Sequence, residues 1–189
     1  MRKPKSSAFL ILFSILMLLG GTGALLSQKR PMTFMDVVCL NRIRGTALSA
    51  NRQYFLYEVS SLDWKDNKRY SDLYLSSVEK GPLMQLTFTK RKNESSPKWH
   101  PESFLFAFIS DRSNKDEIFF MRPDGGEAWQ ITETKEGVIS YDWNSDGSSL
   151  AFLSGKDKEC QLWLMPGPGG QAQKLTDHKT PVEFWLWSP

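Results

Sequence analysis

The sequence predicts an all-β protein built from repeated four-stranded units, and three observations lead to this fold class. Tryptophans that start equivalent segments recur every 44 residues, at Trp99, Trp143 and Trp187. The segments between them are short, rich in aromatic and β-branched residues, and separated by turn residues, as β-strands are. No segment after Arg44 has the pattern of a long helix. A repeat of this length with four short strands per unit is typical of a β-propeller blade, so we expect an incomplete β-propeller.

The composition is that of an ordinary globular protein without a strongly charged surface. The 189 residues include 24 Lys+Arg and 21 Asp+Glu, and 40% of them are hydrophobic. Residues 1–24 carry three of the basic residues and no acidic one, which leaves 21 of each sign in the remainder. We therefore expect no nucleic-acid partner, because binding to nucleic acid needs a basic surface. The two cysteines exclude a disulfide scaffold and a thiolate zinc cluster.

The N-terminal residues 1–24 have the order of a secretory signal peptide. A positively charged start is followed by the apolar run Ala8 to Leu19 and by small residues that end at Ala24, after which we expect cleavage. The alternative is an uncleaved signal anchor, because the uncharged stretch Ala8 to Leu26 is just long enough to cross a bilayer as a hydrophobic helix. Both interpretations export the rest of the chain to the periplasm or the extracellular space. Membrane contact is expected only through this N-terminal segment.

After the leader, the repeat divides the chain into successive parts. Residues 25–45 form a lead-in whose amphipathic part is Thr33 to Arg44. Blade 1 has about seven more residues than the later blades, and we place them in the polar stretch Asp63 to Arg69. Three four-stranded blades and the first strand of a fourth are expected in this order: blade 1 at 46–88, blade 2 at 95–132, blade 3 at 138–176 and the opening strand of blade 4 at 180–189.

Ten residues occupy key positions of the repeat, and we expect them to be structural. The aromatic ones should fill the space between blades, and the threonines end each unit. An Asp-Gly pair supplies the positive φ that the first hairpin turn of blade 3 needs. Asp111 and Arg112, after the second strand of blade 2, are expected to hold a neighbouring loop by a charge-assisted hydrogen bond. The repeat positions are Trp99, Trp143, Trp187, Phe108, Phe152, Asp146, Gly147, Thr87, Thr132 and Thr176.

Three blades are too few to close a ring, since closed propellers typically have about 4 to 8 blades. An open propeller would expose unpaired strand edges and apolar blade faces. We therefore expect this chain to be the front part of a longer protein. Closure by oligomerisation is the remaining possibility.

The residue types that perform catalysis or bind metals form no recognisable motif. The G-x-S-x-G turn of a serine hydrolase is absent. His100 and His178 fall in predicted turns, where we expect solvated loop histidines. The two histidines and the two cysteines, Cys39 and Cys160, are scattered along the sequence, so we predict no metal site. The two cysteines are not expected within disulfide reach of each other. We predict no catalytic residue and no cofactor site in this chain.

The repeat motif and the entry to blade 1 resemble known propellers. A Trp-x-Pro/Ser-x-Gly start, an Ala-Phe strand and a unit that ends in Leu-Thr resemble the WD40-like repeats shared by TolB-type propellers and peptidases of the prolyl oligopeptidase family. Two turns depart from the family pattern, Ala50-Asn51-Arg52 and Pro101-Glu102-Ser103, which lack Asp-Gly and are expected to be looser. The entry segment looks more like the acylaminoacyl-peptidase and dipeptidyl-aminopeptidase branch, and it comprises Thr33 to Val38, Ala47 to Ser49, Tyr54 to Ser60 and Ser71 to Leu75.

This resemblance implies a function for the whole protein. In the prolyl oligopeptidase family a propeller caps a C-terminal α/β-hydrolase domain and admits only small peptides. The chain would then be the N-terminal propeller of an exported serine peptidase that gates and orients peptide substrates, with the hydrolase domain as its partner in cis. The alternative is a periplasmic TolB-like propeller that acts as a scaffold for a protein partner, and a third interpretation is a poorly soluble truncated product. Whether the protein is an enzyme stays open, because this chain has no G-x-S-x-G turn and no triad.

Overall fold

The structure is a computed structural model that describes residues 30–79, 81 and 83–188. The expected signal peptide or anchor at 1–24 lies outside the described residues. Among the helices of the described part, none has the length and hydrophobicity needed to cross a membrane. The described helices are α2, Phe34–Cys39, and the short 3-10 helix η1, Asp157–Glu159.

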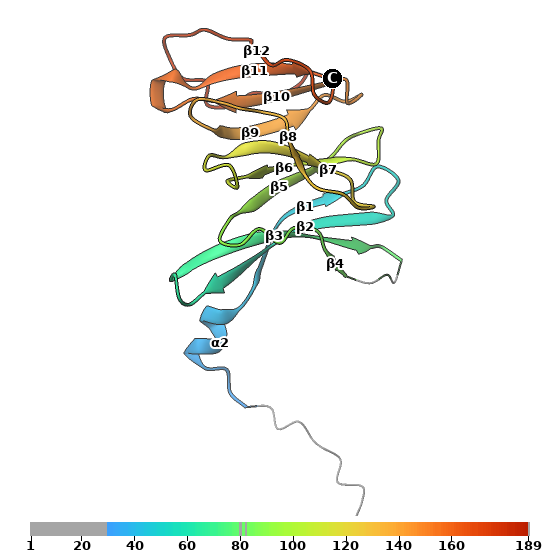
Figure 1. Cartoon of the computed structure of the whole chain (residues 1–189), viewed down its shortest axis with the longest axis vertical. Coiled ribbons are helices and arrows are strands. Elements are labelled where there is room, and N and C mark those ends of the chain that lie inside the picture. Colours follow the sequence, from blue (N-terminus) through green and yellow to red (C-terminus); the bar gives the residue numbers. More distant parts are fainter. Residues whose placement is uncertain (1–29, 80, 82, 189) are drawn as a thin grey trace, which may run out of the picture. The chain divides into compact units, whose positions relative to one another are not determined.

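Twelve described strands form three four-stranded antiparallel sheets, in which each strand pairs with its neighbours in sequence (Figure 1). The prediction of an all-β protein with four-stranded blades is confirmed. Blade 1 comprises β1 (Arg42–Leu48), β2 (Tyr54–Asp63), β3 (Lys68–Ser77) and β4 (Met84–Gln85). Blade 2 comprises β5 (Glu94–Trp99), β6 (Phe106–Ser110), β7 (Glu117–Met121) and β8 (Trp129–Gln130). Blade 3 comprises β9 (Val138–Trp143), β10 (Ser149–Ser154), β11 (Gln161–Pro166) and β12 (Gln173–Lys174).

The blades stack face to face, and the core consists of the two layers between them. Side chains alternate between the two faces of a strand, so one strand of the middle blade serves both layers. Phe106 and Phe108 of β6 pack against blade 1, whereas Ala107 and Ile109 pack against blade 3. All residues of β6 and β7 are buried, which follows from their position in a sheet that is covered on both faces.

Blade 1 differs from the other two by its long central hairpin. Its β2 and β3 have 10 residues each, compared with 5 in β6 and in β7. The extra residues expected at Asp63 to Arg69 therefore lengthen this hairpin, and part of them are strand rather than loop. The first strand, β1, begins at Arg42, inside the segment expected as the lead-in. The expected packing of the lead-in is not observed, because its helix α2 has no buried residue.

The predicted opening strand of a fourth blade, 180–189, is not formed in the described residues 180–188. This segment runs as coil and is fixed to blade 3 by the backbone bond from Val182 N to Cys160 O, at 2.9 Å. A strand needs partners along its whole length, and one such bond does not make a ladder. The last strands of the three blades, β4, β8 and β12, have two residues each.

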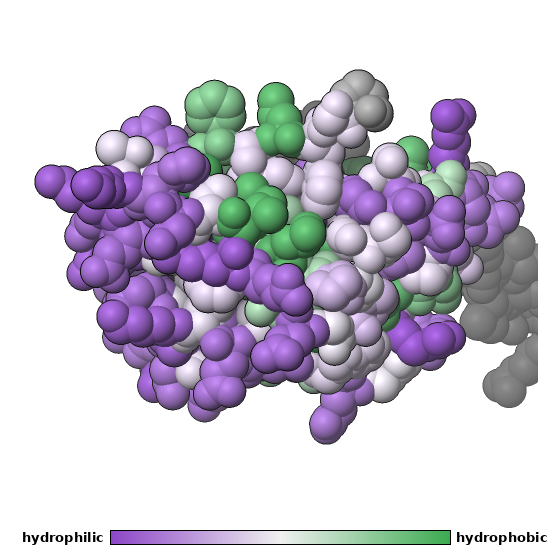
Figure 2. Space-filling model, turned by 90° about the horizontal axis from the view of Figure 1, so that it is seen from above, coloured by the Kyte–Doolittle hydropathy of each residue, from purple (hydrophilic) through white to green (hydrophobic). Residues whose placement is uncertain are grey.

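Apolar side chains remain exposed near the C-terminal end of the described chain. Figure 2 looks onto the end of the stack where blade 3 lies and shows hydrophobic side chains gathered among polar ones. The large exposed apolar side chains of this part are Leu175, Phe184, Leu186 and Trp187. Where exposed apolar side chains lie next to one another, they typically mark a contact surface.

Candidate functional site

The threonines that end each repeat unit form the same contact in all three blades. Each Thr Oγ1 accepts a hydrogen bond from a backbone N–H of the third strand, at 2.8 to 3.0 Å. The same hydroxyl donates to the polar side chain of the residue that directly precedes this N–H group, at 2.6 to 3.2 Å. The threonine therefore ties the outermost strand to its neighbour, which is a structural role. The three sets are Thr87 with Leu73 and Asp72, Thr132 with Ile118 and Glu117, and Thr176 with Leu162 and Gln161.

The tryptophans of the repeat lie at the start of equivalent segments but have different neighbours. Trp99 donates from Nε1 to the carbonyl oxygen of Ala47 in blade 1, at 3.1 Å. Trp143 is buried and stacks on Phe120 with ring centroids 5.3 Å apart. Its Nε1 has no hydrogen-bond partner in the described structure. Trp187 is 37% exposed and contacts another tryptophan of the C-terminal segment.

His100 is buried, which corrects the expectation of a solvated loop histidine. Its Nε2 lies 3.1 Å from the carbonyl oxygen of Gly147, and its Nδ1 accepts the backbone N–H groups of Glu102 and Ser103. The ring also packs edge-on against Trp143 at 4.7 Å. The cause is the tight turn at Gly147, whose missing side chain leaves the space that the imidazole fills. His100 thus joins the first hairpin turns of blades 2 and 3 and has no free ring nitrogen for catalysis.

The first crevice, which we define as the space between blades 1 and 2, contains an arginine that contacts both polar and aromatic side chains. Arg112 donates from Nη2 to Glu94 Oε1 and from Nε to Ser110 Oγ, both at 3.0 Å. Its guanidinium carbon lies 4.8 Å from the ring centroid of Phe119 and 5.3 Å from that of Phe108. This combination of a carboxylate and two aromatic faces is a cation-binding arrangement that the chain satisfies with its own side chain.

The carboxylates of the first crevice are fully buried in Glu94 and partly buried in Asp72. Burial raises the pKa of Glu94, while the positive charge of Arg112 and the hydrogen bond from Ser110 oppose this effect. Burial also raises the pKa of Asp72, against the hydrogen bond from Thr87 and the charge of Arg112. Glu94 Oε2 has no hydrogen-bond partner in the described structure. A buried carboxylate that is incompletely paired depends strongly on its one cation.

Asp111 anchors the loop that carries Arg112, as the sequence indicates for this charged pair. Its carboxylate accepts the backbone N–H of Asn93 at 2.8 Å and the side-chain Nδ2 at 3.1 Å. Asn93 precedes the first strand of blade 2, so the anchor joins the two loops at this edge of the sheet.

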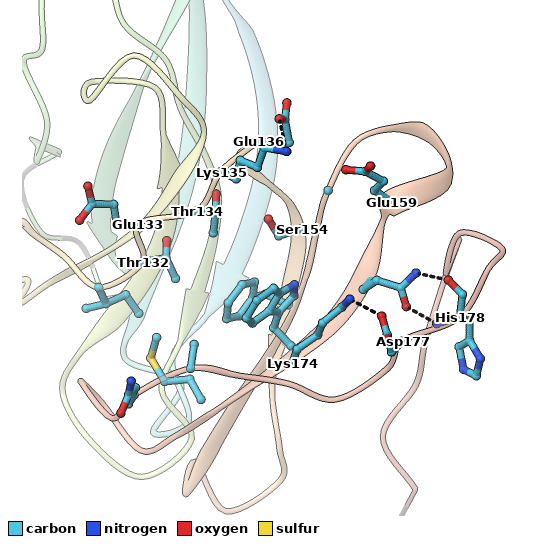
Figure 3. A pocket seen from close by; sticks show the side chains of 18 of the residues that line it. Thr132, Glu133, Thr134, Lys135, Glu136, Ser154, Glu159, Lys174, Asp177 and His178 are labelled. Carbon is cyan, nitrogen blue, oxygen red and sulfur yellow. Dashed lines mark hydrogen bonds and ion pairs between the residues drawn. The ribbon is translucent and has the colours of Figure 1, made fainter.

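The second crevice, between blades 2 and 3, is an open cavity of about 940 Å³ (Figure 3). Its apolar wall is formed by Phe152, Trp163 and Met165, which belong to β10 and β11. Ile131 from blade 2 and Ala172 complete the apolar lining. The first crevice, in comparison, leaves a cavity of about 480 Å³ lined in part by Arg112. An apolar hollow of this size with polar groups at its rim is the usual form of a small-ligand or side-chain binding site.

The rim of the second crevice carries both signs of charge. Lys174 pairs with Asp177, and Lys135 with Glu136. Two further acids, Glu133 and Glu159, and two further lysines, Lys158 and Lys179, line the cavity. The described residues include no metal site, because no three His, Cys, Asp or Glu side chains gather closely enough to hold an ion.

His178, the second histidine, contributes its backbone rather than its ring. Gln161 accepts the backbone N–H of His178 through Oε1 and donates from Nε2 to its carbonyl oxygen, both at 3.0 Å. Figure 3 shows the imidazole turned away from Asp177 and Lys174. The two cysteines, Cys39 and Cys160, are free.

Comparison with known proteins identifies relatives of the fold. No family model matches the chain. The uncharacterized peptidase YuxL of Bacillus subtilis (strain 168) is 24% identical over 112 residues, which cover 59% of this chain and 17% of that protein. Putative TolB from Agrobacterium tumefaciens superposes with a TM-score of 0.58 at 21% identity, over 72% of this chain and 49% of that one.

Two peptidase structures are similar to the same extent. The acylaminoacyl peptidase of Pyrococcus horikoshii has a TM-score of 0.61 at 15% identity, over 74% of this chain and 25% of that one. The β-propeller domain of the Trilobed protease from Pyrococcus furiosus has a TM-score of 0.56 at 16% identity, over 77% and 46% of the two chains. The structural neighbours are thus TolB-type propellers and the propeller domains of peptidases, as the sequence motifs indicate. The chain spans about half or less of each of these proteins.

Proposed function

We propose that this chain is the N-terminal propeller portion of an exported serine peptidase of the prolyl oligopeptidase family. The observation that carries the proposal is the combination of a propeller fold shared with acylaminoacyl peptidase and a sequence match to a bacterial peptidase. In this role the blades gate and orient peptide substrates, and bond cleavage belongs to a hydrolase domain in cis. The described residues agree with this division of labour, since His100 is fully engaged in a turn and His178 uses its backbone.

The exposed apolar surface over blade 3 supports a partner in cis. Leu186 is 87% exposed and Phe184 is 79% exposed, and both follow the last blade in sequence. Blades 1 and 2, and blades 2 and 3, bury apolar faces of this type against each other. A further blade would bury the remaining face in the same way.

The proposal is tested by reading the gene beyond codon 189 and by labelling the full protein. We expect additional blades followed by G-x-S-x-G, an Asp and a His in the same frame, and covalent labelling by a fluorophosphonate probe. A frame that ends without a hydrolase domain, or a full protein that the probe does not label, would overturn it. Export is tested separately by fractionating cells and determining the N-terminal residue of the mature protein, which we expect to be Leu25.

A TolB-like scaffold is the second candidate, favoured by the similarity to putative TolB over about half of that chain. A scaffold would have additional blades but no hydrolase domain. It would bind a protein partner and would not react with the probe. The same gene reading and labelling experiment therefore separates the two functions.

A further inference from the structure

The first crevice shows how this fold holds a cation between two blades. Phe108 and Phe119 are directly opposite each other on β6 and β7, with ring centroids 5.9 Å apart and an interplanar angle of 28°. The guanidinium of Arg112 lies over both rings, and Glu94 accepts its hydrogen bond. In this crevice the chain supplies the cation itself.

The same aromatic pair recurs in the second crevice without a cation. Phe152 and Trp163 are opposite each other on β10 and β11, with ring centroids 6.2 Å apart and an interplanar angle of 9°. They follow Phe108 and Phe119 by one repeat of 44 residues, and both border the open cavity. Phe152 is only 1% exposed, so the accessible ring is that of Trp163, which is partly buried. Among the described residues, no cation contacts the ring of either one; the cation–ring contacts involve Tyr141, Phe108 and Phe119.

The residue at the repeat position of Arg112 is Lys156, and it points elsewhere. Lys156 is exposed and lines a separate surface hollow together with Asp157 and Glu136. Its backbone is extended, with φ of −118°, and it directly precedes η1, which redirects the loop. The anchor is also missing, because Gly155 stands where blade 2 has Asp111. The second crevice therefore keeps the aromatic pair, of which the ring of Trp163 is the accessible platform, and lacks the internal cation.

The surroundings of the platform suit a positively charged side chain from outside. Tryptophan is the best of the aromatic rings for binding a cation, and Trp163 takes the place of Phe119. Glu133 and Glu159 stand at the rim, and no hydrogen bond or ion pair of their side chains is observed among the described residues. Lysines at the rim balance the acids in number, so the rings rather than the net charge must provide the selectivity.

We propose that the second crevice binds a guanidinium group, namely the arginine side chain of a peptide, stacked on the accessible ring of Trp163 as Arg112 lies over that of Phe119. A planar guanidinium stacks on an aromatic face better than the compact, strongly hydrated ammonium of lysine does. The inference does not depend on the proposed peptidase function, because it would hold for a scaffold as well.

The test is a titration of the full chain with N-acetyl-arginine amide, in which the affinity is measured by isothermal titration calorimetry. N-acetyl-citrulline amide, which has nearly the same shape but no charge, is the matched ligand. We expect the citrulline ligand to bind at least about fivefold more weakly than the arginine ligand. Trp163→Leu should weaken binding of the arginine ligand by a similar factor, given the strength of a partly desolvated cation–π contact. Trp129→Leu is the control, since Trp129 is a half-exposed tryptophan of β8 that does not line the cavity. It should leave the affinity unchanged.

A fluorotryptophan-labelled wild-type chain keeps the test independent of the stability of these variants. In fluorine NMR spectra, the Trp163 resonance should shift on addition of the arginine ligand, whereas the Trp129 resonance should not. Equal affinity for the two ligands, equal effects of the two tryptophan substitutions, or no shift at Trp163 would overturn the proposal. Tighter binding by Lys156→Ala would also overturn it, because it would mean that Lys156 occupies the platform in solution.

Discussion

Removal of the Arg112 side chain should be strongly destabilising, because it leaves a carboxylate inside the protein without its cation. The side chain of Glu94 is 0% exposed and that of Arg112 is 23% exposed, and their nitrogen and oxygen atoms are 3.0 Å apart. In Arg112→Leu, Glu94 would keep only the hydroxyl of Ser110 at 3.1 Å. Breaking a buried pair by removing one partner typically costs about 3–5 kcal/mol of unfolding free energy. We expect a loss in this range at pH 7.5, measured by urea unfolding followed by circular dichroism.

The control is a second arginine whose ion pair lies on the surface. Arg122 binds Asp124 through two hydrogen bonds, at 2.7 and 3.0 Å, with side chains that are 57% and 48% exposed. Arg122→Leu should cost about 0–1 kcal/mol, the range for exposed pairs. The double variant Arg112→Leu/Glu94→Leu should recover most of the loss, since apolar residues of similar volume can replace a buried pair. The reasoning would be refuted if the two single arginine variants were equally stable, or if the double variant were no more stable than Arg112→Leu.

Three further predictions use the same unfolding measurement. Thr132→Val should cost about 1–3 kcal/mol, because the buried Glu117 carboxylate and a backbone N–H lose the hydroxyl that joins them. Gly147→Ala should cost more than about 1 kcal/mol, because φ is +72° and the added Cβ would lie 2.3 Å from His100 Cε1. Raising the pH from 5 to 8 should destabilise the wild-type chain more than Glu94→Gln. Burial raises the pKa of Glu94 in the folded state, so its contribution is fully present below the unfolded pKa and is lost as the pH rises through the folded pKa.

Matched variants separate these effects from general damage. Thr132→Ser retains the hydroxyl and should be close to wild type. Gly169 also has positive φ, +92°, but nothing lies within 4 Å of its added Cβ, so Gly169→Ala should cost less than Gly147→Ala. Equal losses for the two glycine variants, or for the valine and serine variants, would contradict the contacts described here. A Glu94→Gln chain with the same pH dependence as wild type would show that this carboxyl does not titrate on unfolding.

The sequence predicts the blades because their signal is periodic and local. The signal consists of tryptophans at 44-residue intervals, threonines at the ends of units and Asp-Gly turns. Each of these features belongs to a local hairpin, so it can be recognised in a single sequence. The threonine contacts recur in all three blades for the same reason. The expected strand at 180–189 fails because its formation depends on partners that the described residues do not supply.

The environment of His100 could not be read from the sequence, because it depends on how two blades approach each other. The turn at Gly147 lies 47 residues further along, and only the stacking of blades 2 and 3 brings its carbonyl oxygen to the imidazole. A signal was nevertheless present. Blade 3 has an Asp-Gly turn where blade 2 has Pro101-Glu102-Ser103, and two N–H groups of the blade 2 turn donate to His100.

The difference between the two crevices lies in the backbone of one loop as well as in its side chains. Residues 111–116 and 155–160 have equal length, yet an aspartate at position 155 could not copy the anchor of Asp111. A Cβ on Gly155, where φ is +133°, would lie 2.3 Å from the carbonyl oxygen of Glu159. The loop around η1 is therefore incompatible with the conformation that directs Arg112 inward, and exchanging Lys156 for arginine alone should not fill the second crevice. Because the blade faces must keep their packing, connecting loops of this kind are where a repeat protein can change what a crevice holds.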